Sequence, residues 1–350
     1  MNGTVIQQAG QDAAMYERLC AFLKSQIPAA TELAVRGLER KPGGASRETW
    51  AFDVAWRENE EPLSRRCILR RDPPASLLDS DQTDRSFEFR VLKALESTAL
   101  PAPRAYWLDR SGAWLERPSL IMQRIGGQPT PVPTFPPSEN SELRAKIAAQ
   151  FVPILAELHR TDWKALGLDF LGVPSIGKEA AAKQVAVWEA VYRKNQLEVH
   201  PILDEAFAWL RRNLPSTDRI SLVHGDYRSG NYLYDEAGRI TAILDWEVAH
   251  LGDPMEDLGW ASMKFWRGDG LAVGLLPRNE LLHRYEQEGG DPVDDKRVFF
   301  YEVLGNAKMA AIALTGARAF SRGASSHMIH GIVGLTVPRL LEDLVGQLGL

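Results

Sequence analysis

The part of this sequence that most restricts its fold is residues 222–260, LVHGDYRSGNYLYDEAGRITAILDWEVAHLGDPMEDLGW. Short apolar runs predict three strands, at residues 220–223, 232–234 and 240–244, and turn residues predict a turn at residues 235–238. A hairpin closed by that turn would return Asp245 to the end of the sheet where Asp226 and Asn231 lie. Three polar side chains are therefore expected to converge at one edge of a small sheet.

Asp226, Asn231 and Asp245 also have the order and spacing of the catalytic residues in phosphoryl-transfer enzymes of the protein-kinase architecture. In those enzymes a loop Asp accepts the proton of a hydroxyl, and an Asn and a second Asp hold Mg²⁺ against the ATP phosphates. The alternative is a solvated acidic loop with Asn and Asp at turn positions, which accounts for each residue singly but not for the ordered set. His224 is interpreted as an architectural histidine rather than a proton shuttle.

The segments HGDYRSGN, ILDWE and GDPMEDLGW resemble the aminoglycoside phosphotransferase-like family, also called the choline-kinase-like or phosphotransferase-enzyme family. The resemblance covers about residue 38 to about residue 322, and the subgroup concerned is similar to the kinase-like domains fused to acyl-CoA dehydrogenases. It implies an α+β, protein-kinase-like fold with two lobes. Residues 1–125 would form a small, β-rich nucleotide-binding lobe, and residues 126–350 a larger, mainly helical lobe for catalysis and acceptor binding.

The resemblance also implies roles for single residues, with ATP and Mg²⁺ as cofactors. Asp226 corresponds to the catalytic base, and Asn231 and Asp245 correspond to the metal ligands. Arg228 lies where kinases place a cation that neutralises the transferring phosphoryl group. Asp257 lies where a buried Asp supports the catalytic loop through its backbone N–H groups, so His224 and Asp257 are expected to be structural supports of the site.

The first part of the chain is predicted to form a helix and three strands, at residues 15–27, 35–38, 49–56 and 67–70. The segment RKPGGASRET between the first two strands has the glycines that a phosphate-covering turn needs, and Ser46 is the predicted nucleotide contact. The segment matches neither a Walker A motif nor GxGxxG, and an ordinary hairpin loop is the alternative. The family pattern has Asn near Arg47, so this sequence departs from it there.

Arg70, at the end of CILRR, occupies the position that ordinarily carries the ATP-binding Lys. A guanidinium can hold two phosphate oxygens at once, so the substitution is chemically sound. Residues 84–96 are predicted to be an amphipathic helix with Glu88 beside its apolar stripe, where it can pair with Arg70. Glu96 and Glu116 are less favoured partners, and a surface cation is the alternative for Arg70.

Two further strands, in LPAPRAYWL and SLIMQRIGGQP, would close the small lobe and lead to a hinge. Adenine recognition at such hinges uses backbone groups, and the carbonyl of Gln123 and the N–H of Ile125 are the predicted contacts. An ordinary strand-to-loop transition is the alternative. Helices are predicted at 141–159, with Pro153 causing a kink or a break, at 183–193, at 201–213 and throughout the region from about residue 254. Five tryptophans are expected in the core, with lining of an acceptor site as an alternative for Trp246 alone: Trp188, Trp209, Trp246, Trp260 and Trp266.

Composition restricts the partners. The chain has 41 Lys and Arg against 46 Asp and Glu, and no basic run indicates nucleic acid. No apolar run is judged long enough to span a membrane, and the N-terminus does not resemble a signal peptide. Only Cys20 and Cys67 are present, so no disulfide framework is expected and a cytoplasmic location is predicted. The oligomeric state stays open.

The predicted function is an ATP- and Mg²⁺-dependent kinase acting on a hydroxyl of a small molecule. Lys308, Arg318 and Arg322 favour an acidic or phosphate-bearing acceptor, such as a hydroxyacyl thioester of coenzyme A, unless they form an ordinary solvated helix face. The alternatives are an aminoglycoside or other antibiotic phosphotransferase, and a kinase-like nucleotide-binding module without catalysis. A metal-dependent phosphohydrolase is less favoured because the histidines show no ligand spacing.

Overall fold

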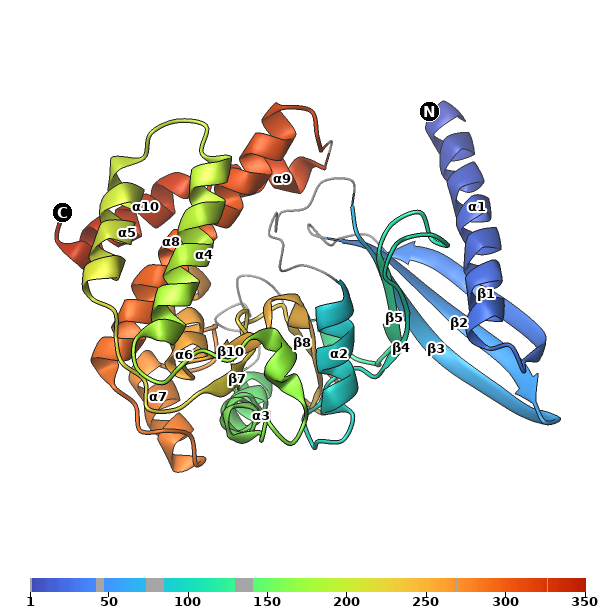
Figure 1. Ribbon diagram of the computed structural model, residues 1–350, viewed down its shortest axis with the longest axis horizontal. Helices are drawn as coiled ribbons and strands as arrows, with labels where there is room; N and C mark the ends of the chain where they lie inside the picture. Colours follow the sequence, from blue (N-terminus) through green and yellow to red (C-terminus); the bar gives the residue numbers. More distant parts are fainter. Residues whose placement is uncertain (1, 42–46, 74–84, 130–140, 268–269, 326) are drawn as a thin grey trace.

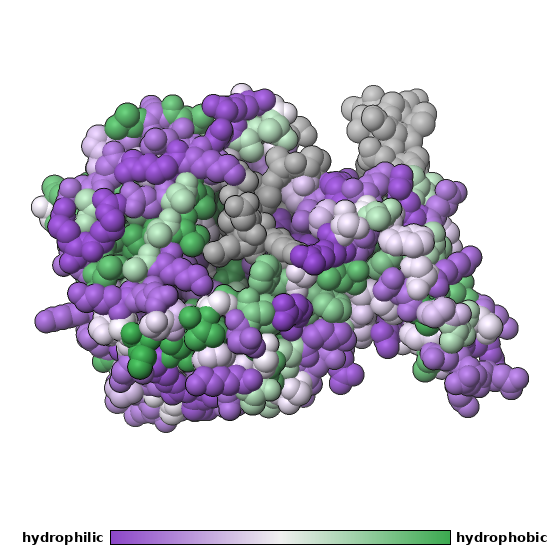
Figure 2. Space-filling view, in the orientation of Figure 1, coloured by the Kyte–Doolittle hydropathy of each residue, from purple (hydrophilic) through white to green (hydrophobic). Residues whose placement is uncertain are grey.

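The computed structural model describes residues 2–41, 47–73, 85–129, 141–267, 270–325 and 327–350. Figure 1 shows a strand-rich part at one end of the molecule and a larger helical part at the other. This arrangement confirms the predicted α+β class, with an antiparallel sheet followed by a mainly helical region. On the face drawn in Figure 2, hydrophilic residues cover most of the surface and apolar residues occur in small groups.

The strand-rich part is an antiparallel sheet of five strands in the order β1-β2-β3-β5-β4. Its strands are β1 (Thr31–Lys41), β2 (Glu48–Glu58), β3 (Glu61–Arg71), β4 (Ala105–Asp109) and β5 (Ser119–Gln123). The first three strands are longer than predicted because apolar residues alternate only over part of each strand. Their exposed ends are held by the cross-strand pairing, which continues to Glu58 and Glu61 at the hairpin turn.

Two helices flank this sheet. Helix α1 (Asn2–Gln26) packs Leu19, Phe22 and Leu23 against the sheet, at the end of the molecule away from the helical part (Figure 1). Helix α2 (Arg85–Leu95) lies between the sheet and the helical part, and its apolar residues join the core of the helical part. The sheet therefore contributes residues to two hydrophobic cores, one shared with α1 and one shared with α2 and the helical part. The division at residue 125 falls directly after β5 and stays a prediction.

The helical part is built around α8 (Asp295–Ser321). The other helices are α3 (Ser141–Arg160), α4 (Glu179–Asn195), α5 (Pro201–Arg212), α6 (Met255–Ser262), α7 (Arg278–Gln287), α9 (Met328–Gly334) and α10 (Val337–Leu348). Helix α8 is long and apolar enough to cross a membrane by composition, contrary to the sequence-based expectation, but 89% of its most apolar window is buried inside the protein. Its apolarity is accounted for by its central position in the core.

Three short-range predictions need correction. Strand β7 (Ser221–Val223) pairs with β10 (His250–Gly252), whereas β8 (Tyr232–Tyr234) pairs with β9 (Ile240–Ile243) on one side and with β6 (Gln128–Pro129) on the other, so the predicted small sheet is two small sheets. Helix α3 is a single helix with Pro153 inside it, so of the two predicted alternatives the break into two helices is wrong and the kink stays a prediction. The region after residue 254 is not helical throughout: between α6 and α7 the described residues, 263–267 and 270–277, have a short 3-10 helix and an isolated bridge.

Candidate active site

The loop between β7 and β8 holds Asp226 in a fixed orientation. Its Oδ1 accepts hydrogen bonds from Trp260 Nε1 at 2.8 Å and from Arg228 Nε at 2.7 Å. Its Oδ2 accepts from Asn231 Nδ2 at 2.6 Å. The side chain is 19% exposed, so it remains accessible from the cavity beside it. A carboxylate fixed in this way is positioned to orient and deprotonate a hydroxyl that enters the cavity.

Asp257 supports this loop from α6, as predicted. Its carboxylate accepts from the backbone N–H of His224 and of Gly225, both at 2.8 Å. His159 Nε2 lies 3.1 Å from the same carboxylate, and its Nδ1 lies 2.7 Å from the Tyr285 hydroxyl. Burial raises the pKa of Asp257, but the hydrogen bond from His159 and the nearby imidazoles outweigh burial and hold the pKa below its ordinary value. Asp257 is therefore an anion that joins three segments.

His224 is architectural, as interpreted from the sequence. Its Nε2 donates to the carbonyl of Leu244 at 2.9 Å, and its Nδ1 accepts from the Asp226 N–H at 3.2 Å. Burial lowers the pKa of His224, which keeps the ring neutral and suited to this donor–acceptor pair. Gly225 has φ +78°, and a Cβ there would lie 2.8 Å from the carbonyl oxygen of Val248. Only glycine fits this position next to Asp226.

Asn231 and Asp245, the predicted metal ligands, both line the same cavity. The backbone carbonyl of Asn231 accepts from the N–H of Leu244 at 2.7 Å, which joins the two loops. Asn231 Nδ2 donates to Asp226, so its Oδ1 points elsewhere. Asp245 has φ +68°, a left-handed conformation that is rare outside glycine and typical of functional positions.

The charge of Asp245 suits a cation. Burial raises the pKa of Asp245, but Arg70 and other arginines outweigh it and lower the pKa to about 2. A carboxylate and an amide oxygen are hard oxygen donors, and Mg²⁺ is ordinarily held by one or two such groups together with substrate phosphates. The two residues therefore fit a nucleotide-linked Mg²⁺. Within the described ranges, no three His, Cys, Asp or Glu side chains form a metal site independent of a nucleotide.

Arg70 and Glu88 form the predicted ion pair, with Arg70 Nη1 2.9 Å from Glu88 Oε1. The two less favoured partners are engaged elsewhere. Glu96 accepts from the N–H of Ala105, and Glu116 pairs with Arg18 and Arg71. Arg70 also donates through Nη2 to Asp245 at 2.6 Å.

Sequence reasoning missed a buried charge cluster beside this pair. Glu247 lies 2.8 Å from Arg47 and 2.9 Å from Arg85, and Asp72 bonds the same two arginines at 3.2 and 2.9 Å. Burial raises the pKa of Glu247 and lowers that of Arg47. The three-residue spacing of Arg85 and Glu88 on one helix was the available signal. Arg47, at the departure from the family pattern, contributes a cation to the cavity.

The predicted nucleotide contacts are only partly described. Ser46 lies outside the described residues. Gln123 ends β5 and Ile125 follows it, and both lie beside a separate cavity of about 380 Å³ with Arg66 and Tyr106. Their role toward adenine stays a prediction.

The main cavity has a volume of about 590 Å³ and lies between the catalytic loop and helices α4, α8 and α9. Its wall opposite the polar residues is aromatic and aliphatic, with Trp188, Trp260, Phe265, Trp266, Met309, Ile312, Ile329 and Val333. Trp188, Trp260 and Trp266, which were expected in the core, therefore line the cavity. Trp246 is a core residue, as first expected: it is buried against His224, and the alternative that it lines the cavity is wrong.

Of the three C-terminal cations, only Lys308 reaches the cavity. Arg318 bonds the carbonyl of Lys194 and the side chain of Asn195 at the end of α4, and Arg322 is exposed. The predicted cationic face therefore reduces to one lysine, because the other two residues lie further along α8.

A sheet-and-helix fold with an Asp–Asn–Asp site between its parts defines the class of kinase-like phosphotransferases. The chain belongs to the phosphotransferase enzyme family, whose profile matches residues 38–295. This assignment confirms the predicted resemblance.

Curated relatives include larger proteins. Acyl-CoA dehydrogenase family member 11 from Rattus norvegicus is 32% identical over 263 residues, which are 70% of this chain and 33% of that protein. The probable acyl-CoA dehydrogenase IBR3 from Arabidopsis thaliana is 29% identical over 311 residues, which are 81% of this chain and 37% of that protein. The chain spans about a third of the length of these relatives.

Solved structures share the fold. A putative aminoglycoside phosphotransferase from Ralstonia eutropha has a TM-score of 0.71 at 24% identity, covering 95% of this chain and 97% of that chain. The aminoglycoside phosphotransferase APH(4)-Ia, in a ternary complex with AMP-PNP and hygromycin B, has a TM-score of 0.57 at 16% identity, covering 93% and 98%. At these identities the likeness shows the fold alone.

Proposed function

We propose that the protein is an ATP- and Mg²⁺-dependent kinase that transfers the γ-phosphoryl group to a hydroxyl of a small acceptor. The observation that carries this proposal is the convergence of Asp226, Asn231, Asp245 and Arg70 on one cavity. The family assignment supports the reaction class, and the AMP-PNP bound to APH(4)-Ia supports a nucleotide donor.

Each residue has a distinct task in this proposal. Arg70, oriented by Glu88, holds phosphate oxygens, and Asp226 takes the hydroxyl proton as the new O–P bond forms and ADP leaves. Arg228, 2.7 Å from Asp226, is placed to neutralise the transferring phosphoryl group. Asn231 and Asp245 would hold Mg²⁺, which when bound reduces the charge on the phosphate oxygens.

The wall of the cavity favours a particular kind of acceptor. Beyond Asp226, Asp245 and Glu247, no carboxylate among the described residues lines it, and Arg47, Arg70, Arg228 and Lys308 do. A polycationic aminoglycoside needs an acidic rim, whereas an acidic or coenzyme A-linked hydroxy compound matches Lys308 and the apolar wall. The names of the curated relatives, acyl-CoA dehydrogenases, are consistent with an acyl-linked acceptor.

The test is ADP formation from Mg·ATP with and without acceptors. We expect hydroxy acids and hydroxyacyl thioesters to increase ADP formation and to become phosphorylated, as detected by mass spectrometry. Kanamycin and hygromycin B serve as comparison acceptors. Nucleotide binding without phosphorylation of any hydroxyl would favour the non-catalytic module, and higher kcat/KM for the antibiotics would favour an antibiotic kinase.

A further inference from the structure

Lys308 occupies an unusual position for a lysine. It is 5% exposed, and its Nζ donates to the carbonyl of Gly225 at 2.6 Å. The ammonium also lies 4.4 Å from the ring centre of Trp260 and 4.9 Å from that of Trp188. Gly225 directly precedes Asp226, so this charge lies beside the backbone of the proposed base.

The charge of Lys308 is not balanced by a carboxylate in direct contact among the residues that the structure describes. In the described part of the chain, no carboxylate forms a salt bridge with it, and Glu256, Asp226 and Asp257 act on it only at longer range. Burial lowers the pKa of Lys308 accordingly. A buried ammonium that keeps hydrogen-bonding capacity is costly unless a partner completes its coordination.

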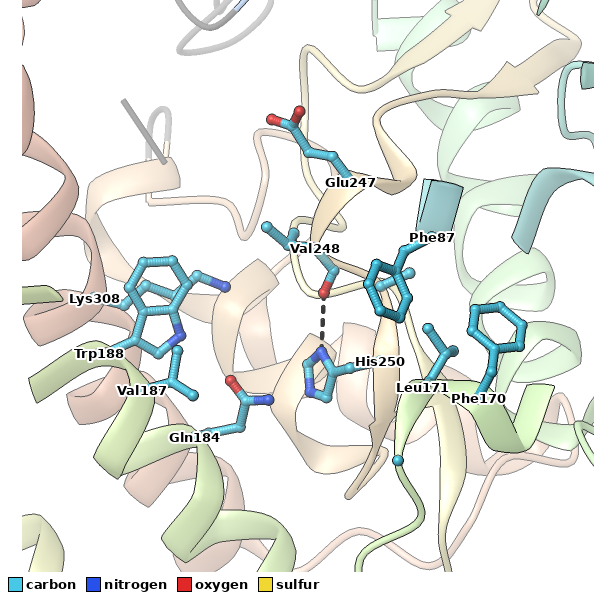
Figure 3. Close-up of a pocket in the computed structure, with 12 residues that line it drawn as sticks. Phe87, Phe170, Leu171, Gln184, Val187, Trp188, Glu247, Val248, His250 and Lys308 are labelled. Carbon is cyan, nitrogen blue, oxygen red and sulfur yellow. Dashed lines mark hydrogen bonds between the residues drawn. The ribbon is translucent and has the colours of Figure 1, made fainter. Parts of the chain in front are cut away.

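A second, smaller cavity shows where such a partner would lie. It has a volume of about 190 Å³, and it adjoins the main cavity across Trp188, Glu247, Val248 and Lys308. Figure 3 shows Lys308 and Trp188 on one side of it, Phe87 and Leu171 on the other, and the amide of Gln184 between them.

The side chain of Gln184 provides a second observation that points to a ligand in the small cavity. The side chain is 8% exposed and lines this cavity, and its amide has no hydrogen bond with any residue that the structure describes. His250 is not available, because its ring nitrogens contact the carbonyl of Val248 at 2.9 Å and Glu256 at 3.1 Å. The small cavity therefore presents two groups with unused N–H donors, the Lys308 ammonium and the Gln184 amide, in walls that are otherwise apolar except for Glu247, His250 and backbone groups.

We propose that Lys308 and Gln184 form a subsite that binds a carbonyl or carboxylate oxygen of the acceptor. The inference rests on the proposed kinase function and adds the group that the enzyme recognises beside the hydroxyl. An oxygen bound to Lys308 is anchored next to Gly225, so the hydroxyl of the same molecule can reach Asp226 in the main cavity. Lys308 thus determines which acceptors the enzyme recognises, and its role is more specific than adding positive charge to the cavity.

The experiment compares acceptors that differ only in this oxygen. The wild type and Lys308→Met are assayed with hydroxybutyrate isomers, with their N-acetylcysteamine thioesters, and with the butanols in which CH₃ replaces the carboxyl group. Loss of one hydrogen bond to a charged group predicts about a 10- to 100-fold lower kcat/KM for the carbonyl-bearing acceptors and less than about a threefold change for the butanols. Arg322→Met, which removes an exposed cation at the end of α8, is the matched control.

The acceptor arms separate the two sources of the oxygen. Selective loss with the free acids identifies a carboxylate, and selective loss with the thioesters identifies a thioester carbonyl. An equal loss with all acceptors, or with acceptor-free ATP hydrolysis as well, would overturn the subsite and leave Lys308 as a support of the catalytic loop. A wild type that phosphorylates butanols as efficiently as hydroxy acids overturns this inference but leaves the kinase function intact.

Gln184→Leu provides an independent variant, because Gln184 has no structural hydrogen bond to lose in the described structure. The same selective loss, about 5- to 30-fold, is expected. If Lys308→Met does not fold, as judged by thermal denaturation, Gln184→Leu decides the question. Unchanged acceptor preference in Gln184→Leu would then contradict the proposal. A wild type that binds Mg·ATP and phosphorylates no hydroxyl refutes the proposed function and the subsite together.

Discussion

Arg70 and Asp245 lie 175 residues apart in the chain, and Arg70 Nη2 is 2.6 Å from Asp245 Oδ1. The contact joins β3 of the sheet to the loop that follows β9 in the helical part. Arg70 simultaneously bonds Glu88 on α2, so one guanidinium connects three elements. We expect the phosphates of a nucleotide and the Mg²⁺ they carry to compete for these same partners.

Arg70→Ala should weaken ATP binding by about 10- to 100-fold, because a bidentate cation is lost from the phosphate site. Arg70→Lys should recover part of the affinity, since lysine keeps the positive charge but cannot bind two phosphate oxygens in the bidentate geometry of a guanidinium. Isothermal titration calorimetry with Mg·ATP measures both. Arg36→Ala, an exposed residue on β1, is the control. Wild-type affinity in Arg70→Ala would transfer the phosphate-binding role to another cation, such as Arg47.

Asp245→Ala should abolish the tightening of ATP binding by Mg²⁺, because the carboxylate ligand is lost. The pKa of Asp245 is lowered to about 2, so the carboxylate stays ionised at all higher pH. Protonation of Asp245 sets in only as pH falls toward this pKa, so the difference between wild type and Asp245→Ala should be the same from about pH 7.5 to about pH 8.5, where ATP is fully ionised. Calorimetry across this range is the measurement. Persistent tightening in Asp245→Ala would refute the assignment.

Trp260→Phe should lower kcat by about tenfold, because it removes an N–H donor to a charged carboxylate but retains an aromatic ring. Trp260 would act as a positioning residue through Asp226, so ATP affinity should not change. Trp209→Phe on α5, where Trp209 packs against Phe299 and Phe300, is a control for the loss of an indole. Steady-state kinetics distinguish the cases. An equal effect of both substitutions on kcat would mean that the indole of Trp260 matters for packing alone.

The catalytic loop could be predicted well from the sequence because its geometry is local. Asp226, Asn231 and Asp245 lie in one loop and one hairpin, so their spacing already determines their approach. The pairing of Arg70 with Glu88 could be predicted because Glu88 lies beside the apolar stripe of its helix. The partners of the short strands could not be predicted, because the sequence pattern of a three-residue strand such as β7 is too short to specify which neighbouring strand it pairs with.

The buried charge cluster and the cavity wall could not be predicted for a different reason. Arg85 and Glu247 are 162 residues apart, and their contact exists only because α2 packs against the loop after β9. Trp188 and Lys308 likewise come from different helices, and an apolar helix pattern does not distinguish a side chain in the core from one that faces a cavity. Tertiary packing decides these positions.

Asp257→Ala should destabilise the fold by about 2–5 kcal/mol, since the backbone N–H groups of His224 and Gly225 would be buried without an acceptor. Equilibrium unfolding by urea measures the change. Glu205→Ala, which removes one partner of an exposed salt bridge with Arg212, should cost less than about 1 kcal/mol. Equal stability of Asp257→Ala and the wild type would show that water replaces the carboxylate.

The kinase account depends most directly on Asp226. Asp226→Asn keeps the size of the side chain but removes the base, so kcat should fall by about 10²- to 10⁴-fold. ATP affinity should stay nearly unchanged, because Asp226 is expected to contact the acceptor rather than the nucleotide. The decisive measurement is kcat for a phosphorylated acceptor together with the ATP dissociation constant, in wild type and Asp226→Asn. A large loss of kcat at unchanged ATP affinity is predicted, and wild-type turnover in Asp226→Asn would contradict the account.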